Sequence, residues 1–526
     1  MRNQICELVF DCRMSQPIGP DYNQQFLLPP ALEDWVPADH PVRFLREFVD
    51  QLDLPALGFA IPDASQGRPP YAPSLLLKIW LYGYFQRIRS TRQLEVACRE
   101  QLGLLWLTGL IQPDHNSLWR FWRDNRLALR AVFQQTVQLA LHTGAVGLVL
   151  QALDGTKIEA VASSYSGWSK AYMEKLLAQL DAALALTEQS IAQENAAPDQ
   201  PGYRLPDTLA QRHALREQIQ VGLAQLASDG RGHYHPVEPE ARRMKVGSTN
   251  RYAYNAQAVA DAHAGILVAC AVVRQETDTG QLVPLIQQAS QNLGVTPAPL
   301  TLADTGYGAG ADLQAAAAAA LPVLVPPAQG TPVKDNPYAA QSFHYDESAR
   351  TVTCPQARQL DYEGQTHKDG VTVQRYRCHV RDCPVRDQCT RDPKGRQFEV
   401  RPSTPAVQAM RARLQEPETQ ARWRQRGQII EPRFAQLKAH DGFRRWSVRG
   451  LAGVRTQWAL LCATLNLRVL YRRWQAGLAG AAVITVTPGP RPSRSGSISL
   501  RRSTPHQPEA DRGGAMFHWL PLLHAA

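Results

Sequence analysis

Two aspartates each follow a short apolar stretch and precede glycine, a pattern that can present a carboxylate at the end of a strand. Asp154 lies in "LVLQALDGTKIEA" and Asp304 lies in "TLADTGYGAG". A third carboxylate, Glu431, lies in the helical segment "RGQIIEPRFAQLKAHDGF". Taken singly, a strand-end aspartate is more often a turn or helix-capping residue. If the three converge, their oxygens would suit two Mg²⁺ ions, the arrangement that drives displacement at a phosphodiester.

The length and composition are those of an ordinary folded protein with several domains. The chain has 526 residues, of which 44% are hydrophobic and 20% charged, so we expect two or three domains. No run of about 18 uncharged apolar residues occurs, so no membrane span is expected. The first residues do not resemble a signal peptide, and Met14 is an alternative start. We therefore expect a cytoplasmic, nucleoid-associated protein with reduced cysteines.

Positive charge is concentrated toward the C-terminal end. Residues 401–474 hold 15 Lys and Arg but 4 Asp and Glu, whereas residues 1–400 sum to about −4. This asymmetry favours a polyanionic partner such as DNA or RNA, the alternative being a solvated basic helix face. Contacts with phosphates would make the affinity salt-sensitive and mostly independent of sequence. The candidate side chains are Arg433, Arg444, Arg445, Arg449 and Arg455.

The hydrophobic pattern changes several times along the chain. Helical spacing comes first, with arginines that suit a helix-turn-helix-like module or a plain helical bundle. Strands and helices then alternate, which predicts a mixed sheet with helices on both faces, an α/β fold preceded by an all-α domain. The predicted division is an irregular segment at 1–40, a helical domain at 41–145, a catalytic domain at 146–475 with a helical hairpin insert (about 168–230) and a Cys-rich insert (about 335–400), and a disordered tail at 476–526.

Four cysteines cluster in a polar, turn-rich segment. They are Cys354, Cys378, Cys383 and Cys389. Four thiolates can bind Zn²⁺ tetrahedrally, although the spacings are wider than those of a tight CxxC knuckle. A structural Zn²⁺ would replace the core that this segment lacks, and a reduced Cys-rich loop is the alternative.

Several segments, in the same order, resemble the bacterial insertion-sequence transposases of the DDE type. The resemblance covers roughly residues 25–474. The segments are "YAPSLLLKIWLYGYFQRIRSTRQLEVACRE", "PDHNSLWRFW", "ALDGTKIEA", "YNAQAVADAHAGIL", "LADTGYG" and "IIEPRFAQLKAHDGFRRWSVRGLAGVRTQWALLCATLNL". Many resembling proteins carry a Cys-rich insert between the second aspartate and the glutamate.

The resemblance implies an RNase H-like catalytic domain that cuts and joins DNA with Mg²⁺ (or Mn²⁺). Asp154, Asp304 and Glu431 would be the metal ligands. Lys438 lies two helical turns after Glu431, on the same face, where it could hold a DNA phosphate. The protein would bind the terminal inverted repeats, cut there with water, and use the freed 3′-hydroxyl to attack target DNA. Because two ends must be held together, we expect a homodimer on DNA.

The sequence departs from the resembling families next to Glu431. Those families often place an arginine four residues before the glutamate and a tyrosine three residues before that arginine, where this chain has Gly427 and Arg424. Arg426 and Trp423 are each one residue out of that register, and Arg426 is kept as a candidate DNA contact. Pro432 predicts that the helix either starts or kinks here, with Glu431 exposed. A catalytically silent DNA-binding relic and a nuclease without strand transfer are the alternatives to a transposase.

Overall fold

The computed structural model describes residues 31–60, 70–195, 207–295, 299–328, 337–339, 342–346, 349–368, 371–400 and 404–483. The predictions for Met14, for most of the N-terminal segment and for nearly all of the tail concern residues outside these ranges. Within them, no helix has the length and apolar character that crossing a membrane requires.

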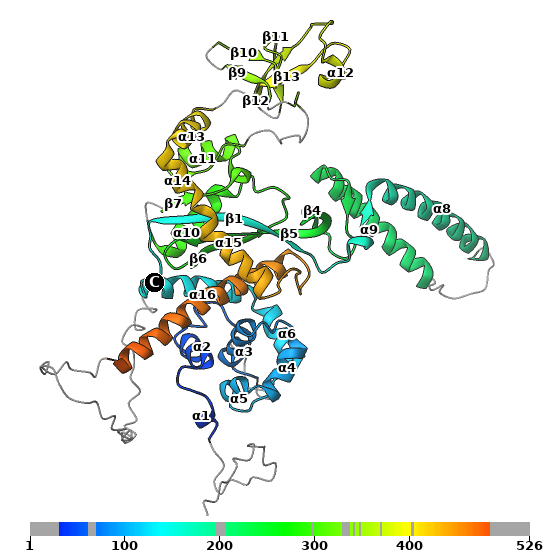
Figure 1. Ribbon diagram of the computed structural model, residues 1–526. Helices are drawn as coiled ribbons and strands as arrows, with labels where there is room; N and C mark the ends of the chain where they lie inside the picture. Colours follow the sequence, from blue (N-terminus) through cyan, green and yellow to red (C-terminus); the bar gives the residue numbers. More distant parts are fainter. Residues whose placement is uncertain are drawn as a thin grey trace, which may run out of the picture.

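Helices and their connections make up the described residues from 32 to 142. In α2 the apolar residues at helical spacing, Val42, Phe44, Leu45, Phe48 and Val49, are all buried. Pro73 stands at the first position of α3, where its missing N–H costs nothing. The helices are α1 (Leu32–Trp35), α2 (Pro41–Asp50), α3 (Pro73–Phe85), α4 (Thr91–Glu100), α5 (Leu102–Thr108), α6 (His115–Asp124) and α7 (Arg126–His142) (Figure 1).

A mixed sheet forms the centre of the molecule. Its strands are β1 (Leu150–Glu159), β4 (Arg242–Val246), β5 (Thr249–Asp261), β6 (Leu267–Val273), β7 (Leu300–Leu302) and β8 (Val323–Leu324). The order is β6-β5-β1-β7-β8, with β4 also paired to β5; β5 is antiparallel to β1, whereas β7 is parallel to β1 and β8 to β7. Every residue of β5 from Tyr252 onward is buried. Since successive side chains point to opposite faces, both faces of the sheet are covered.

Helices from distant parts of the sequence cover this sheet. The helix α15 (Arg426–Ala435) lies against β1 and β5, whereas α10 (Leu282–Leu293) and α16 (Leu451–Val483) lie against β6 (Figure 1). The buried Asn466 of α16 fixes the edge strand, because its side chain accepts from the Leu267 N–H at 2.8 Å and donates to the Leu267 carbonyl at 2.8 Å. The remaining helices after β7 are α11 (Gly310–Ala318), α13 (Pro405–Gln415) and α14 (Pro417–Arg424).

One continuous hydrophobic core runs from the N-terminal helices through the sheet to α16. The helix α16 packs along α7 and α3, so the helical region and the sheet share buried side chains. Asp441 adds a polar link, because its buried carboxylate pairs with Arg87 after α3 and with Arg468 of α16. The division into separate helical and catalytic domains stays a prediction.

Two insertions leave the central body, each with a small core of its own. The first is a helical hairpin formed by β2 (Trp168–Ser169), α8 (Lys170–Asn195), α9 (Asp207–Asp229) and β3 (His233–Tyr234) (Figure 1). The second is an antiparallel sheet of β9 (His344–Asp346), β10 (Thr351–Thr353), β11 (Gln359–Lys368), β12 (Val371–Arg377) and β13 (Gln397–Val400), with the short α12 (Arg386–Cys389). The expectation that the Cys-rich segment lacks a core is wrong: Phe343, Val352, Leu360, Tyr376 and Val400 pack together there.

Candidate active site

Asp154 lies in the middle of β1, not at its end. The strand runs on to Glu159 because β5 pairs with it over the whole stretch, with Asp154 opposite Ala258. The prediction of a strand end was wrong because the apolar run stops at Asp154 although the pairing continues. The carboxylate is 18% exposed and accepts the Gly155 N–H at 2.8 Å.

Asp304 lies two residues after β7, in the turn that the glycine-rich segment predicted. It caps a short 3₁₀ turn, Thr305–Tyr307, by accepting the Gly306 N–H at 2.9 Å. Since β7 is parallel to β1 and Leu302 lies beside Ala152, the chain brings Asp304 to the level of Asp154. Asp304 therefore both caps a turn and lies at the level of Asp154.

Glu431 is supplied by α15, which runs from Arg426 through Pro432 to Ala435. Of the two predicted alternatives, a helix start and a kink, the start is wrong: the helix begins five residues before Glu431 and tolerates the loss of the hydrogen bond that Pro432 cannot donate. A π-helical turn, Gln436–His440, follows directly. The Glu431 side chain is 63% exposed, as expected.

Arg426 joins two of the three carboxylates. Its Nη1 lies 2.9 Å from Asp154 Oδ2, and its Nη2 lies 3.5 Å from Glu431 Oε1. Gly427, the position at which the resembling families have arginine, lies against Glu431: a Cβ there would lie 3.0 Å from Glu431 Oε1. In this chain the guanidinium comes from the neighbouring position, Arg426. Arg426 thus meets the carboxylates, where we expected a DNA contact, and its side chain is 17% exposed.

The two aspartates are electrostatically strained. Burial raises the pKa of Asp154 to about 6; Arg426 opposes this shift and the charge of Asp304 adds to it. Burial likewise raises the pKa of Asp304, and the neighbouring Asp278 raises it further, against the Gly306 N–H. Buried carboxylates with raised pKa values are typical of sites that bind a cation or transfer a proton.

Asp278 is a fourth acidic residue that the sequence reasoning missed. It accepts from Asn255 Nδ2 at 2.8 Å and from Gln257 Nε2 at 2.6 Å. The same Gln257 accepts from the hydroxyl of the fully buried Tyr307, whose pKa is raised by burial and by Asp278, Asp154 and Asp304. The signal was present in the sequence, because Asp278 and Asp304 each follow a strand and each begin the tripeptide Asp-Thr-Gly.

Glycines keep the space around these carboxylates open. A Cβ on Gly306 would lie 3.0 Å from both Asp304 Oδ1 and Asp278 Oδ2, and a Cβ on Gly155 would lie 2.7 Å from Asp278 Oδ1. As the side chains stand, the described residues contain no group of three or more His, Cys, Asp or Glu arranged to hold a metal ion. The observed cation at this place is the Arg426 guanidinium.

The basic candidates divide into two sets. Lys438 and Arg444 lie at the C-terminal half of β1: Lys438 Nζ donates to the Lys157 carbonyl at 3.4 Å, and Arg444 Nε donates to the Lys438 carbonyl at 3.3 Å. Burial lowers the pKa of Lys438, and Asp154 opposes this shift. Arg445 is anchored nearby, on the carbonyls of Ala160 and Val161.

The other arginines do not join this group. The guanidinium of Arg433 packs against Gly265 in the turn between β5 and β6, and Arg455 Nε donates to the Val272 carbonyl at 3.1 Å. Arg449 is exposed and forms no hydrogen bond or ion pair with any residue the structure describes. Trp423, which like Arg426 lies one residue away from the family pattern, holds α14 in place. Its Nε1 donates to the Ala303 carbonyl at 2.8 Å, which connects α14 to the end of β7.

Three of the four cysteines of the second insertion, Cys354, Cys378 and Cys389, pack against its small core. Burial raises the pKa of Cys389, and the charges of Cys354, Cys378 and Cys383 raise it further, against Arg396. All seven cysteines in the described ranges are free thiols.

Two family models match the chain. One, described as a transposase DDE domain, matches residues 353–471, and the other, described as a transposase domain (DUF772), matches residues 30–124. The first match includes Glu431 and Lys438, whereas Asp154 and Asp304 lie outside both matched segments. No curated protein matches the chain. These two matches support an insertion-sequence transposase of the DDE type.

Proposed function

We propose that this chain cuts DNA at the terminal inverted repeats of its element and joins the 3′ ends to target DNA. The observation that carries the proposal is the meeting of Asp154 and Glu431 at the Arg426 guanidinium, with Asp304 close enough to shift the pKa of Asp154. Asp154 comes from a central strand, Asp304 follows the parallel neighbour of that strand, and Glu431 comes from a helix packed on it. The strand order β6-β5-β1-β7-β8 supports an RNase H-like catalytic unit.

The donor set fits Mg²⁺ or Mn²⁺, because these ions prefer carboxylate oxygens and the site already attracts a cation. Asp154, Asp304 and Glu431 would hold the metal, and the space that Gly306 and Gly427 leave beside the carboxylates supports this fit. When bound, such ions lower the pKa of water or of a 3′-hydroxyl and neutralise charge at the phosphate. Binding requires the Arg426 guanidinium to release the carboxylates.

The chain's own residues then position the DNA. Lys438, partly buried beside Asp154, would hold the phosphate next to the one that reacts, and its fixed place on the Lys157 carbonyl limits the reorganisation needed. Arg444 and Arg445 would continue the contact along the backbone, and Arg449 would add an unpaired charge. Arg433 and Arg455 are weaker candidates, since their guanidinium groups are engaged elsewhere.

We further propose that the N-terminal helices contribute to binding the element ends, and that a homodimer holds two ends together. The transposase match over residues 30–124 supports the first point. Zn²⁺ at Cys354, Cys378, Cys383 and Cys389 is also a proposal; it is supported by the packing of Cys354, Cys378 and Cys389 against one small core.

A second candidate is a catalytically silent DNA-binding relative. The ion pairs of Arg426 favour it, because a guanidinium that stays between Asp154 and Glu431 would keep a metal out.

The experiment uses full-length protein and a labelled duplex that carries the element's end. Nicking at the end and joining to a second DNA, with Mg²⁺ but not with chelator, is the expected result, and Asp304→Asn should bind the DNA without either reaction. Binding without any nicking by the wild type would support the silent relative. Nicking without joined product would point to a nuclease.

A further inference from the structure

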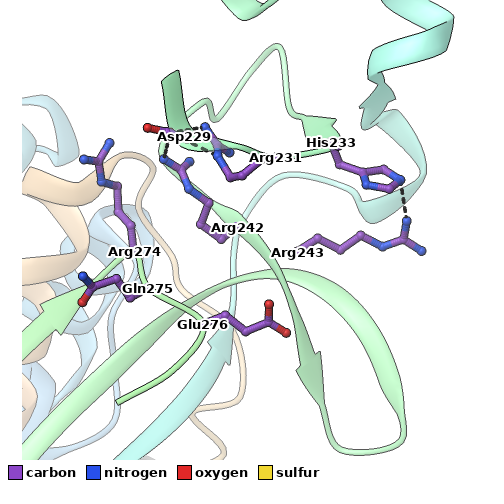
Figure 2. A pocket seen from close by; sticks show the side chains of 9 residues that line it. Asp229, Arg231, His233, Arg242, Arg243, Arg274, Gln275 and Glu276 are labelled. Carbon is purple, nitrogen blue, oxygen red and sulfur yellow. Dashed lines mark hydrogen bonds and ion pairs between the residues drawn. The ribbon is translucent and has the colours of Figure 1, made fainter. Parts of the chain in front are cut away.

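A basic cavity lies where the helical hairpin joins the central sheet, away from the carboxylates described above. It measures about 590 Å³ and is lined by the end of α9, by β4 and by the segment that follows β6. Figure 2 shows Arg231 and Arg242 converging on Asp229, Arg243 reaching His233, and Arg274 entering from the segment after β6. Four arginines thus face one cavity that is lined by two carboxylates, those of Asp229 and Glu276.

The framework of this cavity is rigid. Arg242 is 11% exposed, and its guanidinium is held by the Pro239 carbonyl at 2.8 Å and by Asp229 Oδ2 at 3.1 Å. Arg231 Nη2 pairs with the same Asp229 oxygen at 2.6 Å. Two arginines therefore share one oxygen, which leaves their positive charge incompletely balanced.

The other two arginines, Arg243 and Arg274, have no acidic partner among the described residues. Arg243 contacts the ring of His233 at 2.9 Å, and Arg274 forms no hydrogen bond or ion pair with any residue in the described part of the chain. Burial lowers the pKa of Arg242 to about 10, and the charges of Arg231 and Arg274 lower it further, against Asp229. Such crowding of like charges is unfavourable unless an anion offsets it.

The cavity is connected to the candidate active site through a short segment. Arg274 directly follows β6, and Asp278 is four residues later, bonded to Asn255 and Gln257 beside the carboxylates. Four residues span at most about 14 Å, which corresponds to roughly four base pairs of DNA rise. A strand that passes the carboxylates can therefore reach the cavity within a few nucleotides.

We propose that this cavity binds phosphate groups of the DNA backbone a few nucleotides from the site of reaction. The proposal rests on the proposed function for the identity of the DNA at the carboxylates, but its binding can be measured separately. Paired and half-buried, Arg231 and Arg242 form the wall, while Arg243 and Arg274 donate to the phosphate oxygens. Arginine suits this role because its planar fork donates to two oxygens at once.

The test is the affinity of full-length Asp304→Asn protein for a fluorescent duplex of about 30 base pairs and mixed sequence, measured over a range of salt. Adding Arg243→Ala and Arg274→Ala together should lower the affinity by at least about tenfold. The slope of log affinity against log salt should fall by about two, one for each lost phosphate contact. Arg274→Glu alone should weaken binding more than Arg274→Ala.

Arg212→Ala is the matched control. It removes one exposed positive charge from α9, on the same hairpin but outside the cavity, and should leave both affinity and slope unchanged. Inorganic phosphate, compared with chloride at equal ionic strength, distinguishes the source of the anion. If the cavity serves the DNA backbone, any phosphate that binds there should displace DNA beyond the ionic-strength effect, and the double variant should lose that displacement. Phosphate that binds at these arginines without weakening DNA binding would assign the cavity to a free anion and overturn the proposal.

Unchanged affinity and slope in the double variant would also overturn the proposal. The proposed function fails separately, if the wild type binds the element's end but neither nicks nor joins it. The two failures are therefore distinguishable. If the wild type nicks normally but the double variant binds DNA as tightly as its Asp304→Asn parent, the proposed function stands and the cavity does not contact DNA.

Discussion

Arg426 and Asp154 form an ion pair with a separation of 2.9 Å although they are 272 positions apart in the chain. The same guanidinium lies 3.5 Å from Glu431 Oε1. A cation is therefore already present where the proposed function requires metal ions. If metal ions bind there, the two cations would compete for the same oxygens, and this competition can be measured.

Replacing Arg426 by alanine should strengthen metal binding. A charge-assisted hydrogen bond is worth about 1.5–3 kcal/mol, so its removal should lower the Kd for Mn²⁺ by about tenfold or more. Isothermal titration of the protein without DNA measures this. Arg424→Ala, which removes an exposed arginine from α14, is the control. Weaker metal binding in Arg426→Ala would mean that the arginine supports the carboxylates and does not compete for them.

Asp154→Asn should stabilise the metal-free protein at neutral pH. The pKa of Asp154 is raised by burial to about 6, so the folded state holds a proton that the unfolded state has already released. The free energy of unfolding of the wild type should therefore fall as pH rises from about 4 to about 6 and then level off. The free energy of unfolding of Asp154→Asn lacks this dependence on pH. The stability advantage of the variant over the wild type should therefore grow with pH to at most about 3 kcal/mol.

Urea unfolding at several pH values, with chelator present, gives that difference. The prediction is contradicted if the difference in free energy of unfolding between wild type and Asp154→Asn is the same at pH 7 as at pH 4. That result would mean that Arg426 fully compensates the buried charge.

Asp441→Asn should destabilise the fold. The carboxylate is 3% exposed and pairs with Arg87 and Arg468, which connects the N-terminal helices to α16. Breaking a buried pair by removing one partner costs about 3–5 kcal/mol because it leaves the other charges uncompensated. Chemical denaturation measures the loss. Asp124→Asn breaks an exposed pair with Arg123 and should change little; an equal effect of both variants would argue against the link.

Asp278→Asn should raise the metal concentration that DNA cleavage requires. Asp278 is bonded to Asn255 and Gln257 and lies close enough to raise the pKa of Asp304, so it acts on the site through its neighbours. Loss of such a supporting partner typically costs about 10–100-fold in metal affinity. A titration of activity against Mg²⁺ should show the shift with nearly full activity at saturation. Glu276→Gln, on the same segment, should show none.

Purified protein should contain about one zinc per chain if the cysteines of the second insertion bind it. Cys383→Ser and Cys389→Ser should each lose the metal, whereas Cys98→Ser, at a buried position of α4, should keep it. Because this insertion has its own hydrophobic core, removal of zinc should leave the central sheet folded. Metal analysis by mass spectrometry decides the matter; full thiol reactivity without bound metal would contradict the assignment.

The elements of this fold could be predicted because each depends on local pattern. The spacing of apolar residues in α2, the proline that begins α3 and the strands on either side of the turn before β6 are all visible in the sequence. Asp304 was placed for the same reason, since a strand end followed by glycines predicts a turn. The helical hairpin was likewise expected from two runs of leucines.

The features that were wrong or missed depend on pairing and packing over long distances. Asp154 lies in mid-strand because β5 extends β1 beyond the apolar run. The helix passes through Pro432 because α15 packs on β1 and β5, and packing outweighs one lost hydrogen bond. Arg426 could not be placed between Asp154 and Glu431 without knowing that the strand and the helix are neighbours. Asp278 could be recognised as a neighbour of Asp304 only from the fold, which brings the two Asp-Thr-Gly segments together.

The most direct test of the central claim compares three single substitutions in one assay. Wild type, Asp154→Asn, Asp304→Asn and Glu431→Gln are mixed with DNA carrying the element's end, and joining to target DNA is followed with Mg²⁺. If the three carboxylates form one metal site, each variant should lose joining by several orders of magnitude while binding DNA normally, and Glu418→Gln, an exposed acid on α14, should retain it. A variant of the three that joins DNA at the wild-type rate would contradict the account.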